Sequence, residues 1–174
     1  MKKTRDLEKS RAHILDIAFW EVFTRSFQGV SVDDIVKKTE LTKGAFYHHF
    51  PSKLSLGYAL VEEVIQPLIL ERWIKPLSAY KNPLNGILKQ LQKNIGEASD
   101  DELQYGCPLN NLVQEMAPVD AEFKLRLQTA LNLWIDEMEK QIIKAQENGY
   151  YNRMAEILVL LQEFPRDYPY RRSE

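Results

Sequence analysis

Apolar residues recur every three or four positions along most of this chain, which is the spacing of one face of an α-helix. The first such stretch predicts a helix over residues 7–25, with Ile14, Ala18 and Val22 on its buried side and Gly29 as its stop signal. No stretch shows the alternation of period two that indicates a strand, and no segment repeats. The pattern therefore predicts an all-α fold.

Two short helices are expected next, each preceded by a residue type that caps helices. Ser31 and Asp34 have the spacing of a capping box, which predicts a second helix over residues 32–38. Thr42 is the expected cap of a third helix over residues 43–49. Two helices joined by so short a connection must cross steeply, so this region is predicted to be a helix-turn-helix.

The pattern beyond Pro51 predicts a helical body. Ser52 is the expected cap of a long fourth helix, which Pro67 should kink or end. Asp120 is the expected cap of the longest helix, which runs to Asn148 and spans about 40 Å. Other helices are expected at residues 83–95 and 108–116, a polar break at residues 99–101, a last apolar turn at residues 155–161 and a frayed tail at residues 164–174.

The composition excludes several classes of protein. With 44% hydrophobic and 28% charged residues the chain can bury a core, so disorder is not expected. Its single cysteine can form neither an internal disulfide nor a multi-thiolate metal site. The charged start lacks the apolar core of a signal peptide, and no apolar stretch approaches the roughly 20 residues that span a bilayer. We therefore expect a soluble, cytoplasmic protein that uses no cofactor and no membrane.

The net charge of −2 conceals an asymmetry between two predicted domains, residues 1–57 and residues 58–174. The first carries ten Lys and Arg against seven Asp and Glu, a balance of +3, and the second has a balance of −5. A basic head on an acidic body suggests a polyanion as partner of the head. An asymmetry of this size is equally typical of an ordinary solvated surface.

The third predicted helix is the most informative. Phe46 and Phe50 are four residues apart and fall on one face, where they are expected to anchor the helix. Small residues near its start and hydrogen-bond donors around them suit a helix that enters the DNA major groove. The residues in question are Thr42, Lys43, Gly44, Ala45, Tyr47 and His48. Spacing alone leaves open a surface helix with aromatic anchors.

Residues 29–36 and 41–53 resemble the N-terminal signature of TetR/AcrR-family transcriptional regulators, within a match of roughly residues 14–60. Its specific core is Tyr47, Phe50 and Lys53, three residues apart in each step. Residues 106–116 also resemble a stretch of the ligand-binding bodies in one branch of the family, so the similarity extends to about residue 149.

The resemblance implies an all-helical homodimer whose third helix reads the major groove of a near-palindromic operator. A small-molecule effector in the body would change the spacing of the two heads. The implied function is ligand-responsive regulation of transcription, with repression favoured. By position, the implied DNA contacts are Ser31 and Lys53 on phosphates, Tyr47 and His48 on backbone or base edges, and Thr42, Lys43, Gly44 and Ala45 beside them.

Two features depart from the family pattern. Glu40 occupies the turn position where the family usually has Gly, so a positive φ there would strain the backbone. Only residues 155–161 stand where the family places the two long helices of its dimer interface. The interface is therefore either lost or rebuilt from residues 123–142. The alternative function is a helical ligand-binding or interaction module without specific DNA binding.

Five residues of the body are candidates for the effector pocket: Trp73, Tyr105, Cys107, Phe123 and Trp134. Aromatic residues at helical spacing more often belong to the core. Cys107 precedes a predicted helix, which makes it a candidate sensor of electrophiles or oxidants, although a buried structural role is favoured. Adjacent His48 and His49 point about 100° apart on a helix and do not suit a metal. Neither a catalytic Cys/His pair nor a Gly-rich phosphate loop is present, so an enzyme is not expected.

Overall fold

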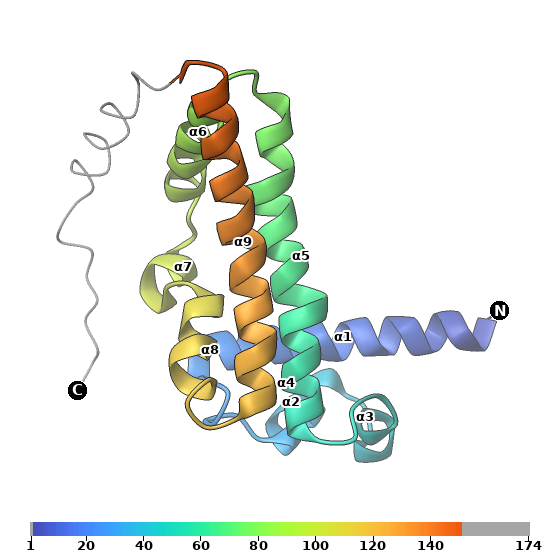
Figure 1. Ribbon diagram of the computed structural model, residues 1–174. Coiled ribbons are helices and arrows are strands. Elements are labelled where there is room, and N and C mark those ends of the chain that lie inside the picture. The colour runs from blue at the N-terminus through green and yellow to red at the C-terminus, as the bar shows by residue number, and fades with distance from the viewer. Residues whose placement is uncertain (1, 151–174) are drawn as a thin grey trace.

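The computed structural model describes residues 2–150, and all regular elements in this range are helices, which confirms the all-α prediction. Helix α1 (Lys2–Arg25) lies across the lower end of a tall bundle, and α2 (Val32–Thr39) and α3 (Lys43–His49) lie beside it at the base (Figure 1). We call residues 2–57 the head and residues 58–150 the body. One continuous apolar core joins the two, because buried residues of α1, α3 and α9 belong to a single cluster.

Helix α1 ends at Arg25 as predicted, but it begins at Lys2 instead of residue 7. Ser26 takes a positive φ of 66°, so Ser26 rather than Gly29 reverses the chain after the helix. Gly29 is required for a different reason. A Cβ at this position would lie 2.2 Å from the Arg25 carbonyl oxygen, so only glycine allows the backbone to pass so closely.

Helices α2 and α3 begin as their caps predict. The Ser31 hydroxyl accepts a hydrogen bond from the Asp34 N–H at 3.1 Å, and the Asp34 carboxylate accepts one from the Ser31 N–H at 2.9 Å. The Thr42 hydroxyl accepts the Ala45 N–H at 3.1 Å. Between the helices Glu40 has φ 57° and ψ 16°, the left-handed conformation that the comparison with a family glycine anticipated. Local hydrogen bonds therefore set the start of each helix, while the turn between them contains one strained residue, Glu40.

Of the two alternatives expected at Pro67, a kink or an end, the end is wrong. A single helical run continues from α4 (Lys53–Ala59) through η1 (Leu60–Ile65), α5 (Gln66–Ile69), η2 (Leu70–Ile74) and η3 (Lys75–Ala79). Both η1 and η2 are π-type turns, and the Gln66 N–H bonds to the carbonyl of Val61, five residues back. Pro67 follows immediately, at the change of register, where its missing N–H costs least.

Three shorter helices cover one side of the bundle: α6 (Pro83–Gly96), α7 (Asp100–Tyr105) and α8 (Pro108–Met116). Asn82 caps α6 with Pro83 at its first position, as predicted. The polar break expected at residues 99–101 is instead the start of α7. Ser99 accepts the Glu102 N–H and donates to its carboxylate, so a capping box turns these polar residues into a helix start.

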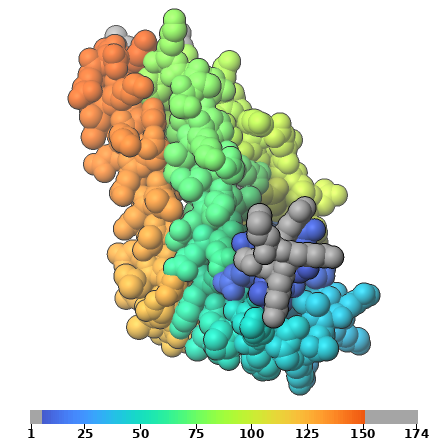
Figure 2. Space-filling view, turned by 90° about the vertical axis from the view of Figure 1, so that its right-hand side faces the viewer, coloured from blue at the N-terminus to red at the C-terminus, as the bar shows by residue number. Residues whose placement is uncertain are grey.

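Helix α9 (Ala121–Glu147) is the longest element and begins at its predicted cap, Asp120. It runs beside the α4–η2 helical run over most of its length (Figures 1 and 2). Phe123, Leu127 and Ala130 are fully buried, whereas Ile135, Ile142 and Ile143 in its second half are exposed. The expectations for residues 155–161 and 164–174 lie outside the described residues.

Within the described helices, none combines the length and hydropathy that crossing a membrane requires.

Candidate functional site

The aromatic anchors predicted for α3 are buried. Phe46 is fully inaccessible and Phe50 is 1% exposed, with their ring centroids 5.8 Å apart. The guanidinium of Arg11 lies 4.3 Å from the centre of the Phe50 ring and donates to the His49 carbonyl at 3.0 Å. These contacts fix the roll of α3 on α1, and they decide which side of α3 faces solvent.

The opposite side of α3 is exposed and carries the residues predicted to meet DNA. Tyr47 is 48% exposed, although its ring also packs edge-on against Phe46 at 5.3 Å. Gly44 leaves open space, since a Cβ there would meet nothing nearer than the Thr42 hydroxyl at 3.8 Å. The exposed residues are Thr42, Lys43, Gly44, Tyr47 and His48, with Ala45 half-buried among them.

Three of the predicted contact residues have partners within the chain. The Lys43 ammonium lies 2.7 Å from the Asp33 carboxylate, with both side chains exposed. The Ser31 hydroxyl donates to Asp34 at 2.7 Å in addition to its capping bond. The Lys53 ammonium lies over the Phe27 ring, 4.7 Å from its centre, and burial lowers the pKa of this lysine. Lys53 would have to leave this ring to reach a phosphate.

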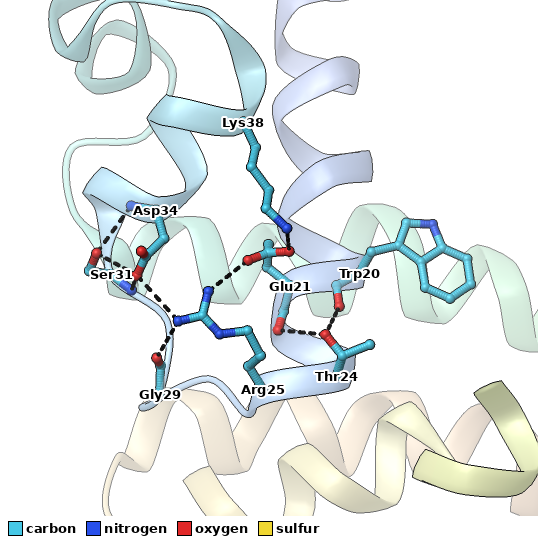
Figure 3. Close-up of polar contacts among 8 residues, drawn as sticks. All are labelled: Trp20, Glu21, Thr24, Arg25, Gly29, Ser31, Asp34 and Lys38. Atoms are coloured by element: carbon cyan, nitrogen blue, oxygen red, sulfur yellow. Dashed lines mark hydrogen bonds and ion pairs between the residues drawn. The ribbon is translucent and has the colours of Figure 1, made fainter.

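A buried acid, which the sequence reading missed, ties α1 to α2. Glu21 is 5% exposed and accepts from Arg25 at 2.9 Å and from Lys38 (Figure 3). Arg25 also reaches the Gly29 carbonyl and lies 3.7 Å from Asp34. The hydrogen bond from Lys38 is the largest effect that lowers the pKa of Glu21. Arg25, four residues after Glu21 on the same helix, is the sequence signal for this pair.

The head's positive charge is therefore partly neutralised from within. Arg25, Lys38 and Lys43 all pair with acids of the head, and Arg11 pairs with Glu63 of the body at 2.5 Å. The net charge of +3 over residues 1–57 does not show that several of these cations are already paired with acids. Backbone N–H groups and the exposed side chains of α3 remain the main candidates for contacts to an anionic partner.

Burial is the main influence on the pKa of His49. His49 is half-buried, and desolvation, followed by the charges of His48 and Arg11, lowers its pKa. Its Nε2 lies 2.7 Å from the Ser10 hydroxyl. Among the described residues, no three His, Cys, Asp or Glu side chains gather as metal ligands would.

The body contains a cavity of about 530 Å³ between the α5–η2 run, α6, α7, α8 and α9. Trp73 and Trp134 line it, with their rings edge-on at 6.2 Å, and so does Cys107. The expectation that Cys107 is buried is wrong: it is exposed, because it is the residue immediately before α8 and its side chain borders the cavity.

Two of the five pocket candidates lie elsewhere. Phe123 is fully buried in the core, with Phe27 and Tyr58 edge-on at 5.0 and 5.1 Å. Tyr105 packs edge-on against Phe23 of α1 at 5.7 Å and does not line the cavity. Helical spacing places all these aromatic residues on inward faces and does not distinguish a core from a cavity wall.

A polar network on the cavity wall also escaped the sequence reading. Arg72 forms an ion pair with Glu102 and donates to the side chain and the carbonyl of Asn94 at 3.1 and 3.2 Å. The Gln90 amide donates to the Arg72 carbonyl at 2.6 Å. Gln90 and Asn94 are buried although they lie within an apolar-patterned helix. A polar pair four residues apart on the inward face of α6 was the available signal.

Comparisons with known proteins agree with this architecture. Residues 14–60 match the family described as bacterial regulatory proteins, tetR family. Over 123 residues the chain is 26% identical to an uncharacterised HTH-type transcriptional regulator in the lacX 3' region of Lactococcus lactis subsp. lactis, covering 71% of this chain and 63% of that protein. It is 27% identical over 143 residues to the HTH-type transcriptional repressor DhaR of Mycobacterium sp. strain GP1, covering 82% and 70% respectively. The chain thus spans less than two thirds of the first of these relatives.

The fold also matches a solved structure, the reduced form of NemR from E. coli. The TM-score is 0.70 at 23% identity, over 80% of this chain and 72% of NemR. The helix-turn-helix head and the names of these relatives support a DNA-binding transcriptional regulator, and the match to NemR shows the same fold. Residues 14–60 match the tetR family of bacterial regulatory proteins, in agreement with the resemblance seen in the sequence.

Proposed function

We propose that this protein is a ligand-responsive repressor that binds a near-palindromic operator as a homodimer and is released by a small-molecule effector. The observation that carries the proposal is the two-sided character of α3. Phe46 and Phe50 fasten one side to the core, while the other side presents small and hydrogen-bonding residues to solvent. In this proposal residues 1–57 bind DNA, and residues 58–174 bind the effector and the second subunit.

The proposed DNA contacts divide into two kinds. Tyr47 and His48 are exposed on α3 and would approach base edges or the backbone, with Gly44 and Ala45 allowing a close approach. Lys53, Ser31 and Lys43 would neutralise or bind phosphates. Thr42 lies at the start of α3 beside these residues, where exposed N–H groups favour anions.

The proposed homodimer would use the second half of α9. Ile135 and Ile142 are 43% and 37% exposed and lie seven residues apart, so they share one helical face. Ile143 beside them is 47% exposed. Three aliphatic side chains exposed on one half of a helix are the sort of surface that a second copy covers.

The proposed effector occupies the 530 Å³ cavity, a volume typical of small-molecule sites. Trp73, Trp134 and Leu131 provide apolar walls, while Arg72 is already paired with Glu102. Since this cation is neutralised, we expect an uncharged, largely apolar effector. Cys107 borders the same space.

Fluorescence anisotropy tests DNA binding directly. The probe is a labelled duplex from the DNA flanking the protein's own gene, titrated at two salt concentrations beside a random duplex. We expect selective binding that weakens steeply with salt, because phosphate neutralisation dominates such affinities. Equal, weak binding to both duplexes would contradict the repressor and favour the alternative, a helical interaction module.

Two variants locate the contacts within the same assay. Tyr47→Ala should cost about 1–3 kcal/mol, with more loss on the selected duplex than on random DNA. Lys53→Ala should weaken binding to all sequences alike and reduce the salt slope by about one unit. Lys124→Ala, at an exposed lysine of α9, is the matched control and should bind like the parent. Parental binding by both head variants would refute the assignment of α3 and α4.

Light scattering tests the dimer. The parent chain should have twice the mass of one chain, and Ile135→Lys should dissociate it, because a charge in an apolar interface is expensive. A parent chain that remains monomeric could not bridge two half-sites about 34–36 Å apart.

A further inference from the structure

A carboxylate of the body holds the backbone of the head at one point. Glu115, one residue before the end of α8, accepts hydrogen bonds from two consecutive N–H groups of the α1–α2 connection. The distances are 2.8 Å to the Phe27 nitrogen and 2.7 Å to the Gln28 nitrogen. The left-handed conformation of Ser26 precedes these two groups, and successive N–H groups after such a turn form a natural site for an anion. We call this contact the Glu115 clasp.

The connection held by the clasp leads straight into the helix-turn-helix. On its other side the Arg25 guanidinium reaches the Gly29 carbonyl and Asp34 of α2 (Figure 3). The Phe27 ring is 3% exposed and sits between Phe123 of α9 and the ammonium of Lys53. A shift of residues 27 and 28 would therefore move both the start of α2 and the ammonium of Lys53.

The other end of α8 borders the effector cavity. Cys107, Pro108, Leu109 and Val113 line the 530 Å³ cavity on one side of α8. A second cavity of about 390 Å³ lies between α8, α1 and η1, and Glu115 is among its walls. Close-packed interiors resist movement of one element alone, whereas a helix with free space on two sides can shift at low cost. α8 is thus a nine-residue helix with the cavity at its start and the clasp at its end.

We propose that α8 transmits occupancy of the cavity to the head through the Glu115 clasp, so that Glu115 is a positioning residue for DNA binding. This inference rests on the proposed function, because it assumes that the head binds DNA. An occupant of the cavity displaces α8, the Glu115 carboxylate leaves one or both N–H groups, and α2 and Lys53 lose their fixed position. The coupling is reciprocal, so DNA binding would in turn disfavour an occupied cavity.

The single cysteine provides a defined probe for this coupling. The Cys107 thiol adds across the C=C bond of N-ethylmaleimide, which forms a thioether and places an N-ethylsuccinimide ring at the cavity wall. The chains compared are the parent, Glu115→Ala, Glu115→Gln and Gln114→Ala, the last being an exposed neighbour on α8 that serves as control. Cys107→Ser shows any effect of the reagent away from this thiol. Far-UV circular dichroism confirms that each labelled chain keeps its helices.

The first readout needs no DNA: NMR measurement of amide hydrogen exchange at Phe27 and Gln28. Glu115→Ala should raise exchange at both amides by about tenfold or more, since two charge-assisted hydrogen bonds are lost. Labelling Cys107 should raise it about fivefold in the parent and in Gln114→Ala, and leave Glu115→Ala unchanged. Should Glu115→Ala not fold, Glu115→Gln keeps the side-chain shape and one acceptor oxygen and should give an intermediate rate. Exchange in the labelled parent identical to that in the unlabelled parent would overturn the proposal.

The second readout is affinity for the labelled duplex by anisotropy. Labelling should weaken binding about fivefold or more in the parent and in Gln114→Ala, and less than twofold in both Glu115 variants. An equal loss in parent and Glu115 variants would show that the signal takes another route, which refutes the clasp. If no chain binds any duplex, the proposed function fails, while the exchange measurement still decides whether α8 and the head are coupled.

Discussion

The aromatic anchors of the head and the tryptophans of the body have different surroundings. In the head, the Ser31 and Thr42 hydroxyls accept backbone hydrogen bonds that set the start of each short helix, and Phe46 and Phe50 are completely enclosed. In the body, Trp73 and Trp134 border a cavity, and the second half of α9 leaves aliphatic side chains in solvent. The head is organised to hold one shape and present one face, whereas the body retains space and surface for partners.

Because of this difference, we expect the enclosed residues to contribute mainly to stability and the residues at the cavity and the exposed faces to contribute mainly to binding. A residue enclosed on all sides contributes its full transfer free energy, while a residue at a cavity wall or exposed face contributes less and is available for binding. Substitutions in the head core should therefore be costly, and equally drastic substitutions around the cavity should be tolerated.

The largest expected contrast is between two aromatic residues. Phe46→Ala should reduce the free energy of unfolding by about 3–5 kcal/mol, because it empties a fully enclosed site. Trp134→Ala, at a half-buried position beside the cavity, should cost less than about 2 kcal/mol. Urea unfolding followed by circular dichroism measures both. Equal losses would show that the body is packed as tightly as the head.

A smaller contrast compares two glycines. A Cβ at Gly57 would lie 2.3 Å from the Phe123 ring and 2.6 Å from the Phe27 ring, where head and body meet. Gly57→Ala should destabilise the protein by about 1–3 kcal/mol through overpacking. Gly96→Ala is the matched control, because nothing lies within 4 Å and alanine is the better helix former, so a gain of up to about 1 kcal/mol is expected. Thermal unfolding of the two variants in parallel measures both effects. A Gly57→Ala chain as stable as the parent would contradict this account.

Acid should weaken the head through Glu21. The hydrogen bond from Lys38, the largest cause, holds the pKa of Glu21 below its usual value. The stabilisation is therefore complete above the unfolded value of about 4.3 and is lost as pH falls through the lowered folded pKa. At pH 7 Glu21→Gln should cost about 1–2 kcal/mol, since both cationic partners are partly exposed. Urea titrations at pH 7 and pH 3 should show the parent and the variant converging in acid; a constant difference would contradict the assignment.

The smallest expected effect concerns the strained turn. Glu40→Gly should raise the free energy of unfolding by about 0.5–1 kcal/mol, because glycine tolerates a φ of 57° without the steric cost that glutamate bears. Ser26→Gly, at the other positive φ, should gain less because the Ser26 hydroxyl accepts the Gly29 N–H at 3.3 Å. Differential scanning calorimetry ranks the two. A loss of stability in Glu40→Gly would show that the glutamate side chain has a stabilising contact.

The sequence predicted the head better than the body for a physical reason. Capping signals at Ser31, Thr42 and Ser52 act within three residues, so they can be read locally and their helices begin where expected. The same local chemistry caps α7 at Ser99, but its polar neighbours are also typical of a loop, so the sequence predicts a break there. The continuation of the helix through Pro67 is not predictable locally, because the π-type register around it accompanies packing against α9.

The candidate sites show the same limit. Exposure of Tyr47 and burial of Phe46 follow from helical spacing and were predictable. The cavity was only partly predictable, since Trp134 lines it while Phe123, on the same helix, is core. The Glu115 clasp joins residues 87 and 88 positions apart, and no local pattern marks such a contact.

The central claim is that the exposed side of α3 binds DNA, and hydrogen–deuterium exchange tests it most directly. The chain is measured alone and with excess duplex at low salt, where phosphate contacts alone sustain binding. We predict slower exchange in residues 42–49 and at the start of α2, with no slowing in the second half of α9 beyond that of the dimer itself. Slower exchange confined to the body, with residues 42–49 unchanged under saturating DNA, would contradict the account.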